Sequence, residues 1–143
     1  MKVLSILIVF VVIVGGVYYI KSRDVMAPSE SMVSNETMVV GAGTYEAYAP
    51  EKLSRAETGR VVLFFRASWC PTCRAVDKDI RAHLGDIPAD LSILDVDYDN
   101  SSALKQKYGV TYQHTFVEVD KDGNLLKKWT GSPTLSALVA QTI

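Results

Sequence analysis

Cysteine, histidine and net charge are all scarce in this sequence. Its 143 residues include two cysteines and two histidines, and the formal net charge at pH 7 is −1. Two cysteines exclude a scaffold held by several disulfides, and they exclude a four-cysteine zinc site within one chain. The near-zero charge argues against binding to nucleic acid, because such proteins usually carry a basic surface. With 48% hydrophobic and 22% charged residues, the chain is neither disordered nor fibrous.

Charged side chains are absent from one long stretch near the N-terminus. Residues 3–20 are almost entirely apolar, and as a helix they would span about 27 Å, close to the hydrocarbon thickness of a bilayer. Tyr18 and Tyr19 stand where an interfacial aromatic belt would lie, and Lys21 follows. We therefore expect residues 1–21 to form a transmembrane anchor. The alternative is a cleaved signal peptide, but the run is long for one and ends in a poor cleavage site.

The expected anchor sets the expected location of the rest of the chain. Only two residues precede the apolar run, so we expect this short end to stay in the cytoplasm and the long C-terminal part to be extracytoplasmic. A cleaved segment would instead give an exported protein. Residues 22–43 are rich in Ser, Met, Val, Gly and Thr without a helical period, which indicates a flexible spacer. The domain proper is expected over residues 44–143.

Apolar patterning predicts alternating helices and strands from residue 44 onward. Residues 61–65 are a continuous run of β-formers, as in a strand buried on both faces. In residues 70–84 apolar residues recur every four positions, as in an amphipathic helix. The other predicted elements are a helix over 44–58, a strand over 91–96, a helix over 101–108, a hairpin of 115–119 with 125–129, and a helix over 133–141. This order predicts an α/β fold in which helices flank a central mixed sheet.

Cys70 and Cys73 form a C-x-x-C motif where the predicted buried strand leads into the next helix. The free N–H groups and the dipole at a helix N-terminus stabilise an anion, so a thiolate there has a lowered pKa. The second sulfur lies one turn on, close enough to close a redox-active Cys70–Cys73 disulfide. We expect Cys70 to attack a partner disulfide and Cys73 to resolve the mixed disulfide. Pro71 suits the first helical turn, because no hydrogen-bond donor is needed there.

A C-x-x-C motif can also be half of a zinc site. A zinc finger would need two further ligands at a suitable spacing. The two histidines, His83 and His114, stand 31 positions apart, which matches no finger pattern. The strand before the motif, the helix after it and the adjacent Trp69 therefore favour redox chemistry.

In these features the sequence resembles the thioredoxin family. Residues 61–73, which read VVLFFRASWCPTC, are similar to the family's active-site strand and helix start, and residues 94–97 to its next strand. Residues 108–110 and 115–117 resemble the segment that leads into the strand beside the active site. The resemblance covers residues 44–143, and among relatives it is greatest to membrane-tethered bacterial thioredoxin-like proteins. It implies a thioredoxin fold and thiol–disulfide exchange with protein disulfides and dithiols. We expect a monomer without a cofactor.

Three positions depart from the family pattern. His114 stands where the family has a cis-proline facing the disulfide. A cis bond before a non-proline residue costs about 2.5–4 kcal/mol, so either the Gln113–His114 bond bears that cost or the backbone differs. Phe64 stands in place of the buried acid that helps to deprotonate the resolving cysteine, and Ile93 in place of the acid's lysine partner. The family's usual proton relay is therefore absent.

The role of His114 stays open at the level of sequence. A neutral imidazole near the sulfurs could carry the proton of Cys73, and a protonated one could stabilise the Cys70 thiolate. His114 could also complete a soft-metal site with Cys70 and Cys73, or it could only fill space. Of its expected neighbours, Trp69 should shield the disulfide. Arg66 is either a positive charge close to the site or a solvated side chain, and the second is favoured. The further residues predicted to surround the sulfurs are Pro71, Thr72 and Gln113.

The favoured function is therefore a membrane-anchored thiol–disulfide oxidoreductase that uses the Cys70–Cys73 pair. Pro71 and Thr72 place no histidine between the cysteines, which slightly favours a reductant or an isomerase over a strong oxidant. The first alternative is a metal-binding or metal-delivery protein that uses both cysteines and His114 on the same fold. The second is a non-catalytic adaptor, for which loss of Cys70 would change nothing in the cell.

Overall fold

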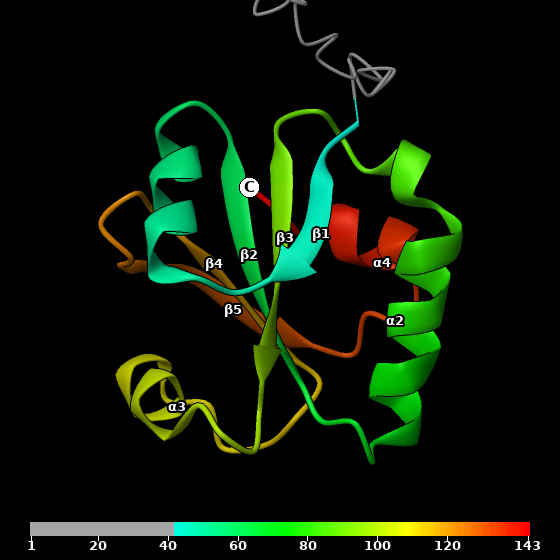
Figure 1. Cartoon of the computed structure of the whole chain (residues 1–143), viewed down its shortest axis with the longest axis vertical. Coiled ribbons are helices and arrows are strands. Elements are labelled where there is room, and N and C mark those ends of the chain that lie inside the picture. The colour runs from blue at the N-terminus through cyan, green and yellow to red at the C-terminus, as the bar shows by residue number, and fades with distance from the viewer. Residues whose placement is uncertain (1–41) are drawn as a thin grey trace, which may run out of the picture. The chain divides into compact units, whose positions relative to one another are not determined.

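A five-stranded mixed sheet organises residues 42–143, the part of the chain that the computed structural model describes (Figure 1). The strand order is β1-β3-β2-β4-β5. The first three strands in this order run parallel, and β4 and β5 are antiparallel to their neighbours. The strands are β1 (Thr44–Ala47), β2 (Arg60–Arg66), β3 (Leu91–Asp97), β4 (Thr115–Val119) and β5 (Leu125–Thr130). The predicted α/β fold with a mixed central sheet is confirmed.

Helices cover both faces of this sheet. The helices α2 and α4 lie on one side, and η1 and α3 lie on the other (Figure 1). Here η denotes a 3₁₀ helix, and a short η2 follows α2. The helical bounds are η1 (Pro50–Glu57), α2 (Pro71–Ala82), η2 (Leu84–Asp86), α3 (Ser102–Tyr108) and α4 (Leu135–Val139).

Strand β2 joins the two cores that these layers enclose. Its side chains alternate across the sheet, so Val62 and Phe64 enter the core under α2 and α4. Val61, Leu63 and Phe65 enter the core under η1 and α3. All five side chains are fully buried. This double burial explains the unbroken apolar run, because a strand covered on both faces has no polar side.

Helix α2 follows the predicted pattern over most of its length. Val76 and Ile80 are buried against the sheet, as the four-residue period predicts. The prediction that the helix extends to Leu84 is wrong, because α2 ends at Ala82 and Leu84 is exposed in η2. The chain turns away from the sheet there, and Ile87 fills the core position beyond the turn.

The prediction of one helix over residues 44–58 is wrong. Residues 44–47 form β1, the edge strand that pairs in parallel with β3. The break follows from Pro50, because the residue before a proline is driven out of the helical region. Ala49 is extended, with φ −145° and ψ 141°, and the 3₁₀ helix η1 begins only at Pro50. Pairing with β3 therefore overrides the helical appearance of the first four residues.

Both ends of the domain differ slightly from the predicted bounds. The folded part begins before residue 44, since Ala42 pairs with Pro88 and the Gly43 N–H donates to the Ile87 carbonyl at 2.9 Å. The predicted C-terminal helix over 133–141 is shorter, because α4 begins after Thr134, whose hydroxyl accepts the Ala137 N–H at 3.2 Å. A capping bond from Thr134 sets this start, as expected of threonine at an N-cap.

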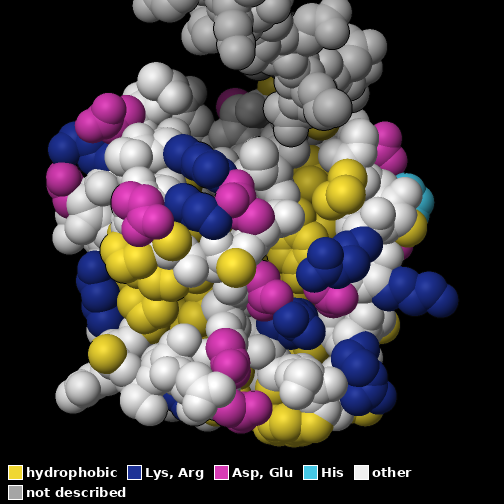
Figure 2. Space-filling model, viewed as in Figure 1, with side chains coloured by type: hydrophobic (Ala, Val, Ile, Leu, Met, Phe, Trp, Pro, Cys, Tyr) yellow, Lys and Arg dark blue, Asp and Glu magenta, His cyan; other side chains and the backbone are white. Residues whose placement is uncertain are grey.

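The predicted anchor over residues 1–21 and the spacer up to residue 41 lie outside the described residues. Within residues 42–143, no helix is both long and apolar enough to cross a membrane. On the face drawn in Figure 2, Lys and Arg side chains are interspersed with Asp and Glu. This mixture agrees with the formal net charge of −1.

Arg66 is not the solvated side chain that the sequence predicts. At the end of β2, its guanidinium makes a two-pronged ion pair with Asp95 of β3, with a shortest distance of 2.6 Å. It also lies 3.8 Å from Asp77 of α2, whose carboxylate accepts the Tyr45 hydroxyl at 2.7 Å. The pair is mostly buried, with side-chain exposures of 24% for Arg66 and 16% for Asp95. Arg66 therefore ties β2, β3 and α2 together.

Replacing Arg66 by methionine should lower the free energy of unfolding by about 2 kcal/mol. The change leaves the mostly buried Asp95 carboxylate without its cation, and removing one partner of such a pair costs more than the pair contributes. Urea denaturation followed by tryptophan fluorescence measures the loss. The matched control is Arg81→Met, which removes a more exposed pair with Asp77 and should cost less than about 1 kcal/mol. Equal losses in the two variants would contradict a structural role for Arg66.

Candidate active site

The site begins where β2 ends and α2 starts. Cys70 is the N-cap residue of α2, with extended backbone angles, and Pro71 is the first residue of the helix. The Cys70 sulfur itself accepts the Cys73 backbone N–H, at 3.4 Å. A sulfur therefore occupies the place where a serine or aspartate oxygen usually satisfies a free N–H.

Hydrogen bonds stabilise the thiolate form of Cys70. The thiol is 3% exposed, and burial alone would raise its pKa. The Thr72 hydroxyl, 3.1 Å from the sulfur, and the thiol and N–H of Cys73 act in the opposite direction. Together they lower the pKa of Cys70 to about 7. A large share of Cys70 is therefore the nucleophilic thiolate at neutral pH.

Cys73 has the opposite character. It is fully buried, and burial raises its pKa, as does the hydrogen bond between its thiol and Cys70. Backbone hydrogen bonds from Ala67 and His114 act against these effects, but the pKa of Cys73 still rises to about 11. Both cysteines are in the free thiol form. In the dithiol state Cys73 thus keeps its proton, and its S–H donates a hydrogen bond to the Cys70 sulfur.

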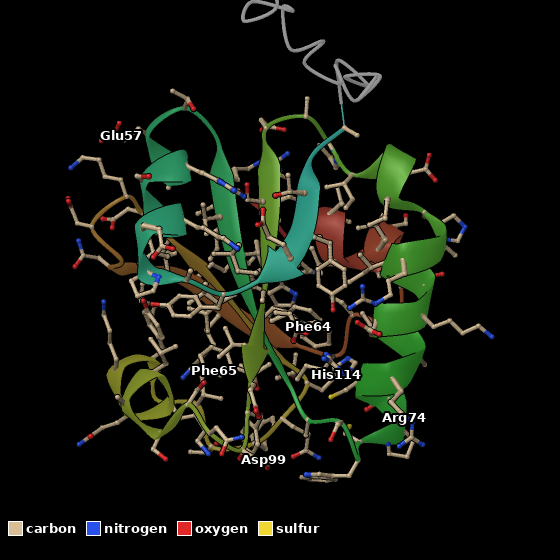
Figure 3. All side chains as sticks on the ribbon, in the orientation of Figure 1. Glu57, Phe64, Phe65, Arg74, Asp99 and His114 are labelled. Atoms are coloured by element: carbon tan, nitrogen blue, oxygen red, sulfur yellow. The ribbon has the colours of Figure 1, made fainter. Side chains whose placement is uncertain are left out.

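The loop before Cys70 is held from two sides. More than half of the Trp69 side chain is exposed, and its indole N–H donates to Asp99 at 3.0 Å. The Arg74 guanidinium donates to the carbonyls of Ser68 and Trp69, at 3.3 and 3.1 Å. Figure 3 shows Arg74 on α2 and Asp99 beyond β3 at the same end of the molecule. These contacts present Trp69 beside the N-terminus of α2 as an exposed aromatic surface.

His114 is placed next to Cys73 by an unusual backbone. No peptide bond in residues 42–143 is cis, so the Gln113–His114 bond is trans. His114 instead has a φ of +59°, the left-handed conformation that a non-glycine residue adopts at a cost. Its N–H donates to the Phe65 carbonyl at 2.9 Å, which continues the pairing of β4 with β2. The sequence left open a cis bond before His114 or a different local backbone, and the structure has the different backbone.

The half-buried His114 ring packs against the edge of the apolar core, near Phe64 (Figure 3). It packs edge-on against Phe64 of β2 and Phe116 of β4, with ring centres 6.0 and 5.5 Å apart. Its Nε2 lies 3.2 Å from the Ser132 carbonyl, in the loop between β5 and α4. Burial lowers the pKa of His114 below its ordinary value. The ring is therefore neutral at pH 7.

A cavity of about 450 Å³ opens beside the helix start. Thr72, Gln113 and His114 line it, together with Gly131 and Pro133 of the loop after β5. Its walls carry no charged side chain. The cavity brings together Thr72, Gln113 and His114, three of the residues predicted to surround the sulfurs. Arg66 does not line it and pairs with Asp95 instead.

The structure does not assemble the alternative metal site. Within residues 42–143, no group of three or more His, Cys, Asp or Glu side chains is arranged to hold a metal ion. His114 therefore does not form such a group with Cys70 and Cys73, and its Nε2 lies 3.2 Å from the Ser132 carbonyl.

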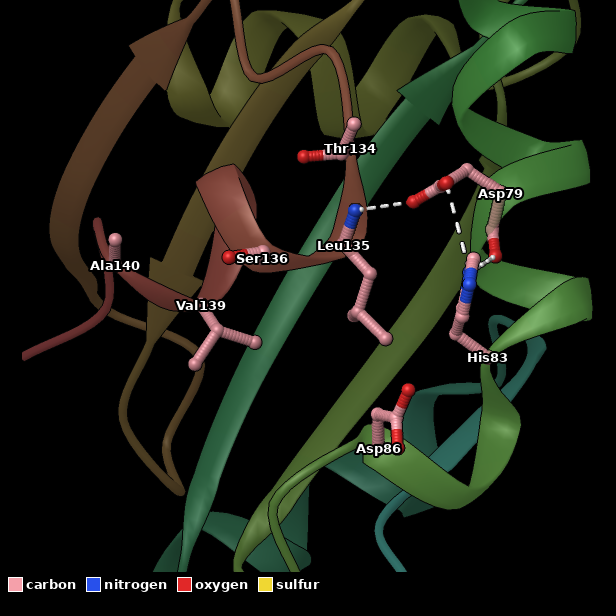
Figure 4. Close-up of a pocket in the computed structure, with 8 residues that line it drawn as sticks. All are labelled: Asp79, His83, Asp86, Thr134, Leu135, Ser136, Val139 and Ala140. Carbon is pink, nitrogen blue, oxygen red and sulfur yellow. Dashed lines mark hydrogen bonds and ion pairs between the residues drawn. The ribbon is translucent and has the colours of Figure 1, made fainter.

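A larger cavity, of about 630 Å³, lies between the far end of α2 and α4 (Figure 4). Asp79 accepts the Leu135 N–H there at 2.7 Å, and His83 Nδ1 lies 3.5 Å from the Asp79 carboxylate. Asp79 follows Cys73 by six residues, or about 9 Å of helix rise. These contacts couple α2 to α4, and they lie apart from the sulfurs.

The fold agrees with comparisons to known proteins. The Thioredoxin family model matches residues 43–143. The chain belongs to the thioredoxin family. A thioredoxin H-type of Ricinus communis is 28% identical over 102 residues, covering 71% of this chain and 85% of that protein. Membership of the family establishes thiol–disulfide oxidoreductase activity in general for this chain.

Solved thioredoxin structures support the assignment. Trxlp from Edwardsiella tarda superposes with a TM-score of 0.55 at 26% identity, covering 68% of this chain and 96% of that one. Fasciola hepatica thioredoxin gives a TM-score of 0.52 at 26% identity, covering 62% and 83% of the two chains. The departures predicted at Phe64 and Ile93 are apolar side chains, fully buried in the same core as both cysteines. Neither position 64 nor position 93 therefore supplies a carboxylate or an amine.

Sequence reasoning missed several contacts of the site. The sequence predicts only that Thr72 lies near the sulfurs, whereas its hydroxyl forms a hydrogen bond with the Cys70 sulfur. The anchoring of the loop by Arg74, and the Ser132 carbonyl that orients His114, had no signal in a single sequence. The glycine at position 131 was a usable signal in the sequence, because glycine is favoured where the backbone has a positive φ. Gly131 has a φ of +82° in the turn that brings the 131–133 loop to the site.

Replacing Thr72 by valine should raise the pKa of Cys70 from about 7 toward the ordinary value of about 8.5. Valine has the same shape but cannot donate to the thiolate. At pH 7 the thiolate fraction, and with it the rate of alkylation by iodoacetamide, should fall roughly five-fold. The control is Thr111→Val, an exposed threonine of the loop before β4, which should leave the pH profile unchanged. An unchanged profile in Thr72→Val would show that the hydroxyl does not stabilise the thiolate.

Proposed function

We propose that the protein is a membrane-anchored reductase of disulfides in partner proteins, with Cys70 as the nucleophile and Cys73 as the resolving thiol. The observation that carries the assignment of roles is the contrast between the two thiols. Cys70 lies at the helix start with a pKa of about 7, whereas the buried Cys73 has a pKa of about 11. At neutral pH only Cys70 can begin the exchange as a thiolate.

The exchange takes place in two displacements. The Cys70 thiolate attacks one sulfur of the partner's disulfide, which forms a mixed disulfide and releases the partner's first thiolate. Cys73 then loses its proton and attacks the Cys70 sulfur, which releases the partner's second thiolate. The dithiol is oxidised by two electrons to the Cys70–Cys73 disulfide, and the partner is reduced by two electrons. A donor in the same compartment must return the dithiol to its reduced form.

The degree of thiolate stabilisation supports a reductant. Strongly oxidising members of the fold hold their reactive thiol at a pKa of about 3.5, whereas thioredoxin holds it at about 7. The pKa of Cys70, about 7, falls with the second group. The donors around the sulfur are neutral groups, Thr72 and Cys73, and no cation is among the causes of the shift. The reduced form is therefore stabilised only moderately.

The apolar run over residues 3–20 supports the membrane anchor. An uncharged cavity beside Cys70 and the exposed Trp69 suit a protein partner whose disulfide is flanked by uncharged or apolar residues. Thiol exchange with such a partner needs no metal and no bound cofactor.

Replacing Cys73 by serine should trap partners, because the mixed disulfide on Cys70 then has no resolving thiol. We expect the full chain with Cys73→Ser to accumulate high-mass adducts that dithiothreitol removes, seen on non-reducing gels of membrane fractions. The matched variant Cys70→Ser should give none. Adducts of equal intensity in both variants would contradict the assigned roles. A Cys70→Ser variant that keeps full activity in cells would indicate an adaptor.

The reduction potential of the full chain should lie near about −270 mV, the value of thioredoxin. Titration with dithiothreitol, followed by thiol labelling and mass, measures the equilibrium of the Cys70–Cys73 disulfide. A potential near about −120 mV would instead identify a disulfide donor. Failure to form the disulfide at any potential would exclude redox function.

A further inference from the structure

One buried acceptor near the site has no partner. Among the side chains of residues 42–143, His114 Nδ1 is the buried nitrogen or oxygen atom that forms no hydrogen bond. The Ser132 carbonyl can only accept, so Nε2, at 3.2 Å from it, must carry the ring proton. Nδ1, which is itself buried, therefore holds a lone pair that has no hydrogen-bond partner. Leaving such a lone pair unsatisfied is costly, which calls for a function or a transient partner.

The surroundings of His114 contain few groups that could use this lone pair. Phe64 faces the ring from β2 and Phe116 faces it from β4. The loop after β5 contributes the Ser132 carbonyl, and α2 contributes Cys73, whose sulfur meets the His114 backbone. No charged side chain is among the causes that shift the pKa of His114. Cys73 is thus the titratable group of α2 that adjoins His114.

The Cys73 proton loses its acceptor during the reaction. In the dithiol, the Cys73 thiol donates to the Cys70 sulfur, which raises the pKa of Cys73 and lowers that of Cys70. Once Cys70 is part of a mixed disulfide, its sulfur carries no negative charge and is a weak acceptor. The thiol must then find another acceptor before it can attack. Phe64 and Ile93 supply none, because both side chains are hydrocarbon.

We propose that His114 is the general base of the resolving step, with Nδ1 taking the proton of Cys73, directly or through one water, once Cys70 is bound to the partner. This inference rests on the proposed function. The base that deprotonates Cys73 is thus a histidine of the loop before β4. On β2, the corresponding position holds Phe64, which cannot accept a proton.

The step balances as follows in atoms and electrons. The Cys73 S–H bond breaks and an Nδ1–H bond forms, which leaves a thiolate and an imidazolium. The thiolate forms the Cys70–Cys73 disulfide, and the bond between Cys70 and the partner sulfur breaks. The departing partner thiolate takes the proton back from the imidazolium. Two electrons pass from the two cysteines to the partner, and His114 returns to its neutral form.

Burial suits His114 to this task. The lowered pKa keeps the ring neutral at pH 7, so that the lone pair is available without prior deprotonation. The same burial makes the imidazolium short-lived, which favours return of the proton to the leaving thiolate. The Ser132 carbonyl, bonded to Nε2–H, holds the tautomer and stabilises the transient charge.

The test separates the two displacements with dithiobis-nitrobenzoate as the disulfide. Mixing the reduced full chain with this reagent releases one coloured thiolate when Cys70 attacks and a second when Cys73 resolves. The first phase depends on reagent concentration and the second does not. Because this leaving group needs no proton, the second phase reports the deprotonation of Cys73.

The informative variants are His114→Asn and His114→Gly, since both residues tolerate the left-handed φ of +59°. Neither side chain is a base. The second phase should slow roughly 100-fold at pH 7 in both, with the first phase unchanged. Imidazole in solution should restore part of the rate in His114→Gly. The matched control, His83→Gln, changes the histidine at the far end of α2 and should leave both phases unchanged.

The wild-type chain supplies a second measurement that needs no variant. Its second phase should level off above the pKa of His114, which burial lowers from its ordinary value. A rate that instead keeps rising with pH well above neutrality, as ionisation of Cys73 without a base requires, would overturn the proposal. An unchanged second phase in His114→Asn and His114→Gly would also overturn it, as would a slowing that imidazole does not relieve. Absence of the first phase in wild type would instead contradict the proposed function itself.

Discussion

The cap of α2 by the Cys70 sulfur is the interaction on which the site depends. The sulfur accepts the N–H of Cys73 and the hydroxyl of Thr72, both from the first turn of the helix. The Cys73 N–H is available because Pro71 starts the helix there, which leaves the N–H groups of the first turn without backbone acceptors. The Thr72 side chain adds the second donor. This one local geometry thus caps the N-terminus of α2 and lowers the pKa of the Cys70 thiol. It also places the Cys73 thiol one helical turn further along.

The sheet keeps this geometry in place. Strand β2 is buried on both faces, and it delivers the chain to the helix start from the centre of the molecule. Arg66, at the end of β2, ties the strand to β3 through Asp95, and Arg74 holds the loop that follows. The reactive sulfur therefore projects from rigid elements, although its neighbours Trp69 and Gln113 lie in loops. Rigid support of this kind reduces the ordering that each encounter with a partner requires.

Much of this arrangement could be predicted from the sequence. The run over 61–65, the C-x-x-C motif and the hairpin are local patterns, and the structure has them within a residue or two. The edge strand β1 could not be predicted, because its pairing with β3 joins segments nearly fifty residues apart and overrides local propensity. For the same reason Arg66 was predicted to be solvated, since its partner Asp95 is close only in the folded sheet.

The sequence by itself determined the chemistry: two thiols one helical turn apart after a buried strand, with phenylalanine and histidine where the family has an acid and a proline. Only the tertiary structure decided how these residues interact. It placed His114 in a trans, left-handed backbone, turned its Nε2 to the Ser132 carbonyl and left the buried Nδ1 without a hydrogen-bond partner. The physical reason is that burial and hydrogen-bond partners set proton affinity, and both are properties of neighbours that the chain brings together only by folding.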